Sequence, residues 1–174
     1  MTPRIFLIGF MGSGKSTIGK LLADSLRWNV VDMDTFIEEK HFKTVGQLFE
    51  GHGEAKFREI ERMALKEISQ FENTVISTGG GCPCFFDNMQ TMLLQGTCIY
   101  LKLSAEELTA RLLKSQIDRP LIRGKNEEEL LQFIRRKLDE RESFYSQSQI
   151  IIDCSDKREM TIVQEIFEKI TIFA

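Results

Sequence analysis

Gly9-Phe10-Met11-Gly12-Ser13-Gly14-Lys15-Ser16 is the stretch of this 174-residue chain that decides its fold. It fits the pattern G-x-x-x-x-G-K-[ST] at every fixed position. An apolar run, Arg4–Ile8, precedes it, and a helical pattern begins at Lys15. Glycines let successive backbone N–H groups point inward, and the start of a helix favours negative charge. The sequence therefore predicts a phosphate-binding loop between a strand and a helix.

Residues in a loop of this kind have defined tasks toward a nucleotide. Lys15 would reach the β- and γ-phosphates of ATP, and Ser16 would supply its hydroxyl to Mg²⁺. The loop residues that we expect to contact ATP are Gly12, Ser13, Gly14, Lys15, Ser16 and Thr17. Kinases, GTPase switches and mechanical ATPases all use such loops, so the purpose of the nucleotide depends on residues elsewhere.

Short apolar runs alternate with amphipathic stretches along the chain. The runs are apolar nearly throughout, which is typical of strands covered on both faces. The predicted strands are Arg4–Ile8, Asn29–Asp32, Thr74–Ser77, Thr97–Leu103 and Gln149–Ile152. The predicted helices are Lys15–Leu26, Val45–Glu50, Glu54–Gln70, Phe86–Leu94, Ala105–Lys114, Glu127–Phe144 and Arg158–Ile170. Because right-handed crossovers make such strands parallel, we expect an α/β fold with a five-stranded parallel sheet between two helical layers.

Capping residues support several helix boundaries. Pairs that fit the N-cap and N3 positions are Thr44 with Gln47, Ser104 with Glu107, and Asn126 with Glu129. Gly51 and Gly96 stand where helices would end. No repeat or linker divides the chain, so we expect residues 1–174 to form a single domain. The polar segment 115–125 interrupts two helices and is the candidate for a mobile lid.

Composition narrows the class of protein. Hydrophobic residues make up 42% and charged residues 28%, as in ordinary globular proteins, and the net charge of −3 argues against a nucleic-acid partner. No apolar run reaches the roughly 18 residues that span a bilayer, and the N-terminus does not resemble a signal peptide. We therefore expect a cytoplasmic monomer that binds neither membrane nor nucleic acid. Its four cysteines are expected to be reduced thiols, with a redox role for Cys82 and Cys84 left open.

Two carboxylates follow the second predicted strand. Asp32 and Asp34 leave the carboxyl end of that strand, and such ends gather beside the phosphate loop in a parallel sheet. Asp32 is closer to the strand, so we assign it to the magnesium ion through water, and Asp34 to the hydroxyl of an acceptor. The alternative is that one of them caps a helix at Thr35.

A charged pair and a run of glycines complete the candidate acceptor side. Arg58 and Glu61 are spaced to pair on one helix face, and a solvated surface bridge is the default interpretation of such a pair. Gly79, Gly80 and Gly81 follow the third predicted strand. Glycines there would let a ligand lie on bare backbone, although a simple flexible turn is the alternative.

Together, the order and spacing of these pieces resemble the shikimate kinases. The matching elements are Gly9–Thr17, Asp32-x-Asp34, Phe49-x-x-x-Gly53-Glu54-x-x-Phe57-Arg58-x-x-Glu61, Thr78-Gly79-Gly80-Gly81, Arg119-Pro120-Leu121 and Arg141-x-x-x-Tyr145. They run from residue 5 to about residue 153. The phosphate loop is generic, but the aspartate pair, the FRxxE element and the triple glycine together are specific to that family.

The resemblance implies a P-loop kinase with the nucleoside-monophosphate-kinase type of fold. It further implies transfer of a phosphoryl group from ATP to the 3-hydroxyl of shikimate, on the chorismate pathway to aromatic amino acids. Arg58 and Arg141 match the family's two arginines that bind the carboxylate of shikimate, and Glu61 would hold Arg58 in place. Asp34 matches the aspartate that holds the ring hydroxyls and acts as base or orienter.

The resemblance also assigns the remaining site residues. Gly80 would offer its backbone N–H to shikimate, with Gly79 and Gly81 shaping the floor of the pocket. Arg119 matches the lid arginine that closes over the phosphates, and Arg111 the arginine that stacks on adenine. The loop 153–158 should complete the adenine pocket, without any one residue singled out.

Three rival functions remain at this stage. A gluconate kinase of the same fold would not account for two carboxylate-binding arginines together with FRxxE and the triple glycine. A nucleotide-binding regulator without catalysis would not need Lys15, Asp34 and Arg119 all intact. A GTPase switch would carry an Asn/Thr-Lys-x-Asp motif, which this sequence lacks.

Overall fold

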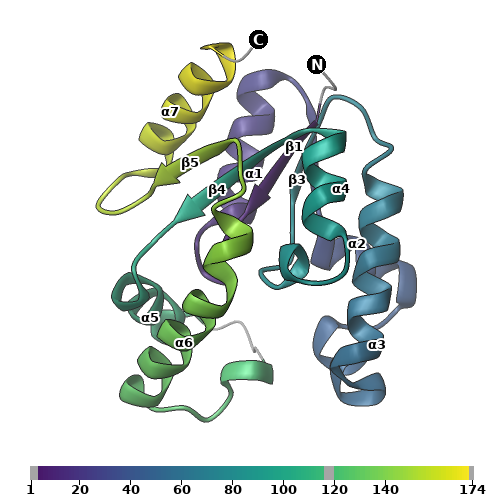
Figure 1. Ribbon diagram of the computed structural model, residues 1–174, viewed down its shortest axis with the longest axis vertical. Coiled ribbons are helices and arrows are strands. Elements are labelled where there is room, and N and C mark those ends of the chain that lie inside the picture. Colours follow the sequence, from purple (N-terminus) through teal and green to yellow (C-terminus); the bar gives the residue numbers. More distant parts are fainter. Residues whose placement is uncertain (1–3, 116–119, 173–174) are drawn as a thin grey trace.

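The sheet of the protein is parallel throughout. The computed structural model describes residues 4–115 and 120–172, and within them five strands pair in the order β2-β3-β1-β4-β5 (Figure 1). The strands are β1 (Arg4–Ile8), β2 (Asn29–Asp32), β3 (Thr74–Ser77), β4 (Thr97–Lys102) and β5 (Ile150–Asp153). The predicted five-stranded parallel sheet is confirmed. Only the ends of β4 and β5 differ from the predicted bounds.

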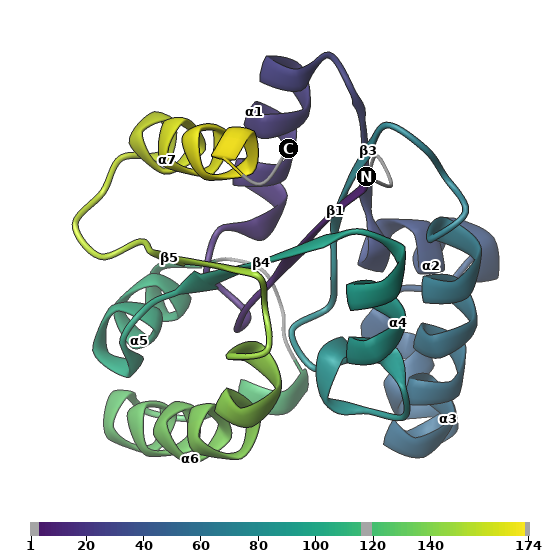
Figure 2. The same ribbon diagram turned by 45° about the horizontal axis from the view of Figure 1, so that its top comes forward.

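Helices cover both faces of the sheet. They are α1 (Lys15–Leu26), α2 (Met33–His41), α3 (Val45–Ile68), α4 (Asn88–Gln95), α5 (Ala105–Lys114), α6 (Glu127–Tyr145) and α7 (Glu159–Ile172), with 3-10 turns at Cys82–Cys84 and Pro120–Ile122. Figure 2 shows α1 and α7 together on one side and α2, α3 and α4 together on the other. Side chains of β1 alternate between the two layers. Ile5 and Leu7 pack in one apolar cluster, and Phe6 and Ile8 in the other. The predicted three-layer α/β/α architecture is therefore confirmed.

The predicted capping boxes are all present. Thr44, Ser104 and Asn126 each accept a hydrogen bond from the backbone N–H three residues on, and the Gln or Glu side chain at that position returns to the cap. The predicted stop at Gly51 is wrong, because α3 continues through it. The helical backbone breaks instead at Gly53, whose φ of 76° and ψ of 168° are non-helical and open to glycine, so α3 consists of two helices joined at a kink, as predicted, with the break two residues later than expected.

Two expectations about β2 need correction. The strand lies at the edge of the sheet and is not covered on both faces, since the side chain of Val30 is 41% exposed. The helix α2 starts immediately after it and was missing from the predicted helices, although the capping alternative for the aspartates implied a helix at Thr35. Asp32 ends the strand and caps α2 at once, so no loop separates the two elements.

The predicted lid lies partly beyond what the structure covers. Residues 116–119, and Arg119 with them, lie outside the described residues. The described remainder contains Ser115, which caps α5, and the 3-10 turn Pro120–Ile122. None of the described helices is long and apolar enough to cross a membrane.

Candidate active site

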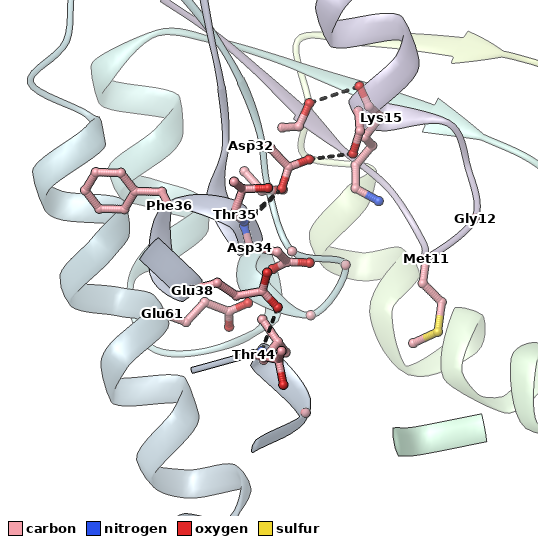
Figure 3. Close-up of a pocket in the computed structure, with 18 of the residues that line it drawn as sticks. Met11, Gly12, Lys15, Asp32, Asp34, Thr35, Phe36, Glu38, Thr44 and Glu61 are labelled. Atoms are coloured by element: carbon pink, nitrogen blue, oxygen red, sulfur yellow. Dashed lines mark hydrogen bonds between the residues drawn. The ribbon is translucent and has the colours of Figure 1, made fainter. Parts of the chain in front are cut away.

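A cleft of about 1200 Å³ opens at the carboxyl ends of the central strands. The phosphate loop forms one wall, and the other walls come from the ends of β2 and β3, from α2 and α3, and from Arg141 of α6. Figure 3 shows Lys15, Asp32 and Asp34 in one neighbourhood, with Glu61 to the lower left of Asp34. Among the described residues that the sequence assigned to nucleotide and to acceptor, all except Ser13 therefore line one continuous cleft.

Glycines shape the phosphate loop as expected. Gly9, Gly12 and Gly14 all have positive φ, at 146°, 83° and 95°. A Cβ on Gly9 would also approach the carbonyl oxygen of Leu101 to 2.7 Å, so a side chain is excluded there twice over. Ser13, within the loop, is buried. The backbone path is therefore one that other residues could not follow.

The ammonium group of Lys15 lies inside the curve of the loop. Its Nζ donates to the carbonyl oxygens of Gly9 and Phe10, both at 2.9 Å, and the side chain is buried. The start of α1 is also tied to β3, because Ser77 Oγ donates to the carbonyl oxygen of Lys15 at 2.9 Å. The cation is thus held where phosphate oxygens on the loop would meet it.

Ser16 and Asp32 meet at the mouth of the loop. The hydroxyl of Ser16 donates to Asp32 Oδ2 at 2.5 Å, while Asp32 Oδ1 accepts from the backbone N–H groups of Asp34 and Thr35 at 3.1 and 3.3 Å (Figure 3). The capping alternative is therefore correct for Asp32. It leaves Oδ2 on the side of the phosphate loop. Thr17 follows Ser16 and also lines the cleft.

Oxygen donors of this kind suit a magnesium ion. Mg²⁺ is usually held by one or two protein oxygens, with water and substrate phosphates completing its shell. Ser16 and Asp32 supply that number, and the described residues contain no group of three or more Asp, Glu, His or Cys side chains that would form a closed metal cage.

Arg58 and Glu61 form a buried pair, so the solvated surface bridge is the wrong interpretation. Their side chains are 5% and 1% exposed, with 2.8 Å between Arg58 Nη1 and Glu61 Oε2. Arg58 also bonds Glu54 at 3.0 Å, and its guanidinium carbon lies 4.3 Å from the centre of the Phe85 ring. Burial raises the pKa of Glu61 to about 7, although Arg58 acts in the opposite direction.

The triple glycine is a place of close contact and not a flexible turn. A Cβ on Gly79 would lie 2.5 Å from Glu61 Oε1 and 3.2 Å from Asp34 Oδ1. A Cβ on Gly81 would lie 2.7 Å from both terminal nitrogens of Arg58. The distances to Glu61 and Arg58 are below any normal carbon contact and the distance to Asp34 is unusually tight, so the glycines let these three side chains lie directly on bare backbone.

The second arginine approaches the same backbone from α6. Arg141 Nη1 donates to the carbonyl oxygen of Gly80 at 3.3 Å, and the guanidinium carbon lies 5.2 Å from the centre of the Phe10 ring. The hydroxyl of Tyr145 donates to the same oxygen at 2.5 Å. Arg58 and Arg141 therefore converge on the Gly80–Gly81 peptide from opposite elements of the fold.

Of the two remaining predicted arginines, Arg111 lines the cleft from the last turn of α5. Its Nη1 would lie 3.8 Å from a Cβ on Gly14, so it borders the phosphate loop. Arg119 lies outside the described residues. The sequence assigned no task to Phe85 or Tyr145. Tyr145 was at least part of a matching motif, whereas no sequence pattern pointed to Phe85.

Comparisons with known proteins agree with this arrangement. The family model described as shikimate kinase matches residues 11–171. A shikimate kinase of Bacteroides fragilis is 49% identical over 156 residues, covering 90% of this chain and 87% of the relative. The crystal structure of shikimate kinase from Bacteroides thetaiotaomicron is similar with a TM-score of 0.93 at 43% identity, covering 98% of this chain and 99% of that one. Shikimate kinase from Acinetobacter baumannii, in complex with shikimate, has a TM-score of 0.90 at 30% identity, covering 98% and 94%. This chain therefore belongs to the shikimate kinase family.

Proposed function

We propose that this chain transfers the γ-phosphoryl group of ATP to the 3-hydroxyl of shikimate, giving shikimate 3-phosphate for the synthesis of chorismate and aromatic amino acids. The observation that carries the proposal is the convergence of Arg58 and Arg141 on the Gly80–Gly81 peptide, in the same cleft as the phosphate loop. Two guanidinium groups at one point are suited to a carboxylate, because each can offer it a forked pair of donors.

The acceptor would lie along the triple glycine. Arg58 and Arg141 would hold the carboxylate of shikimate at one end, and Asp34 would meet the hydroxyls at the other end, beside Gly79. Gly80 would offer its N–H to the ring. Because Asp34 carries a carboxylate, it can orient the 3-hydroxyl toward the phosphate loop and accept its proton during transfer.

ATP would lie on the loop residues from Gly12 to Thr17. Lys15 would contact the transferring phosphate, and Arg119 and Arg111 are proposed to cover the phosphates and the adenine. Ser16, directly, and Asp32, through water, would hold Mg²⁺, which neutralises charge on the β- and γ-phosphates when bound. The 2.5 Å contact between Ser16 and Asp32 supports their joint role.

We further propose that residues 1–174 act as one kinase domain and as a cytoplasmic monomer, with 115–125 as its lid. Two contacts of the described part of this segment support the lid. Leu121 lines the cleft, and Arg123 Nη1 bonds Glu50 Oε1 of α3 at 2.9 Å. The segment thus reaches across to the helix that carries Arg58.

The proposal is tested by ADP release with shikimate, quinate, gluconate or no acceptor in the presence of Mg²⁺. Release should depend on shikimate, and release with gluconate alone would overturn the proposal. Two variants then separate the ends of the acceptor. Arg58→Ala should mainly raise the KM for shikimate, about ten- to hundredfold. Asp34→Asn keeps the shape but cannot take up the proton, so it should chiefly lower kcat.

A further inference from the structure

One buried hydroxyl near the acceptor end of the cleft has no part in the function proposed so far. Tyr145 closes α6, its side chain is 0% exposed, and its hydroxyl donates to the carbonyl oxygen of Gly80 at 2.5 Å. Burial raises the pKa of this phenol, so the hydroxyl keeps its proton and remains a donor throughout the neutral range.

That carbonyl oxygen has a second donor, which is Arg141. Arg141 lies one helical turn before Tyr145 on the same face of α6, and its Nη1 is 3.3 Å from the oxygen. The contact is long for a hydrogen bond, whereas the Tyr145 contact is short. Tyr145 therefore supplies the shorter hydrogen bond to Gly80 and Arg141 the longer one, while the guanidinium of Arg141 also interacts with the Tyr145 hydroxyl and the Phe10 ring.

The hydroxyl also fixes the orientation of the peptide between Gly80 and Gly81. In a trans peptide the carbonyl oxygen and the following N–H point in opposite directions, so holding the Gly80 oxygen on α6 turns the Gly81 N–H away from α6. The guanidinium of Arg58 packs against the α-carbon of Gly81 on this same peptide. Neither glycine has a side chain that could hold the peptide in place by itself.

The ring of Tyr145 is held independently of the site. It packs against Tyr100 of β4, with ring centres 5.0 Å apart, and Tyr100 in turn donates to Glu142 at 3.1 Å. The end of α6 also packs against the 3-10 turn Cys82–Cys84. The tyrosine therefore links the sheet to the glycine backbone.

We propose that Tyr145 is a positioning residue for the acceptor, because its hydroxyl satisfies the Gly80 carbonyl and leaves Arg141 available to the carboxylate of shikimate. This inference rests on the function proposed above. Without the hydroxyl, Gly80 would depend on Arg141 alone, and the arginine would have to divide its donors between the protein and the substrate.

The test is Tyr145→Phe, which deletes the hydroxyl and keeps the ring. The KM for shikimate should rise about three- to tenfold, with the KM for ATP and the melting temperature close to those of the parent. Tyr100→Phe is the matched control. It removes the other buried phenolic hydroxyl of the same cluster, which bonds Glu142 and not Gly80, so its KM for shikimate should stay unchanged.

A double variant shows whether the effect passes through Arg141. In an Arg141→Ala background, adding Tyr145→Phe should raise the KM for shikimate less than twofold. An unchanged KM in Tyr145→Phe, an equal rise for ATP, or a full rise in the Arg141→Ala background would overturn the inference. A parent chain that does not use shikimate at all would overturn the proposed function as well.

A spectroscopic measurement keeps the inference testable even if Tyr145→Phe folds poorly. The chain has two tyrosines, so 3-fluorotyrosine incorporated into the Tyr100→Phe protein labels Tyr145 alone. Saturating shikimate should shift this ¹⁹F resonance, because the carboxylate draws Arg141 away from the shared oxygen. A resonance that does not move on shikimate binding would overturn the inference.

Discussion

Gly81→Ala perturbs the acceptor site without touching a functional side chain. Gly81 has φ −90° and ψ −16°, which alanine adopts without strain. The added methyl, however, would lie 2.7 Å from both terminal nitrogens of Arg58 and 2.8 Å from its Cζ. The substitution therefore introduces a steric clash between the backbone at residue 81 and the guanidinium group of Arg58.

The size of the effect follows from that contact. Non-bonded carbon atoms are most stable about 3.5–4.0 Å apart, so the guanidinium must retreat by roughly 0.8 Å. The guanidinium is confined by Glu61 at 2.8 Å and by the Phe85 ring at 4.3 Å. It can therefore move only by withdrawing from the cleft or by disturbing its packing against these two side chains. Losing its charge-assisted bonds to a substrate carboxylate is worth about 1.5–3 kcal/mol, or roughly ten- to hundredfold in the KM for shikimate.

A coupled assay of ADP release, with shikimate and ATP varied separately, measures this directly. The KM for ATP should stay within about twofold of the parent. Gly51→Ala is the control, because the same methyl in α3 would meet open space, and it should leave both KM values unchanged and stabilise the helix by about 0.5–1 kcal/mol. Gly81→Ala combined with Arg58→Ala should be no worse than Arg58→Ala alone.

A folded Gly81→Ala variant that binds shikimate as well as the parent does would refute this expectation. Overpacking of a buried site costs about 1–3 kcal/mol, so thermal unfolding must show that the variant is native at the assay temperature. A parental KM in a native protein would mean that the guanidinium of Arg58 does not bind the carboxylate from its present position.

Further predictions concern charge at the site. Burial raises the pKa of Glu61 to about 7, so the carboxylate that anchors Arg58 becomes protonated as the pH falls below about 7. The KM for shikimate should therefore rise below this pH. The Glu61→Gln variant should have a raised KM that does not change with pH in this way. Because this pKa is raised above 4.5, the contribution of Glu61 to the unfolding free energy is largest below about pH 4.5 and is lost as the pH rises to about 7. Urea titrations at several pH values should show this decrease in unfolding free energy for the parent and not for Glu61→Gln. Lys15→Met should abolish transfer in the ADP assay and, because two loop carbonyls lose their donor, lower the unfolding free energy by about 1–3 kcal/mol. Asp32→Asn keeps the oxygen that caps α2 but loses the charge facing Ser16. It should therefore raise the Mg²⁺ concentration for half-maximal activity about tenfold while the melting temperature stays nearly constant. An unchanged Mg²⁺ requirement would show that Asp32 does not contribute to the metal site.

The parts of the fold that depend on neighbouring residues could be predicted from sequence. The phosphate loop, the three capping boxes and the bounds of β1, β2 and β3 are each determined within a few residues of chain. The parallel orientation of the strands followed from the alternation of strands and helices, whereas their order in the sheet was not predicted. Gly51 misled because a glycine ends a helix only when the backbone turns there, and the turn is made two residues later at Gly53.

Burial of a particular charge could not be predicted in the same way. Arg58 and Glu61 carry the spacing of an ordinary surface pair, and only contacts from distant parts of the chain enclose them. Gly81 and Phe85 approach Arg58 from beyond β3, and Asp34 approaches Glu61 from the start of α2. The family resemblance, and not the pattern of the pair, identified Arg58 as a binding residue.

Each of the three glycines after β3 is in close contact with a different part of the site. These contacts fix the distance between the acceptor end and the phosphate end of the cleft. Gly79 admits Asp34 and Glu61, and Gly81 admits Arg58. Gly80 packs on the phosphate loop itself, where a Cβ would lie 3.0 Å from the backbone nitrogen of Met11. The backbone that contacts the acceptor residues therefore also touches the backbone that would hold the phosphates. A shift of either wall would change the distance between the acceptor hydroxyl and the transferring phosphate, and transfer is sensitive to errors of about 1 Å in that distance.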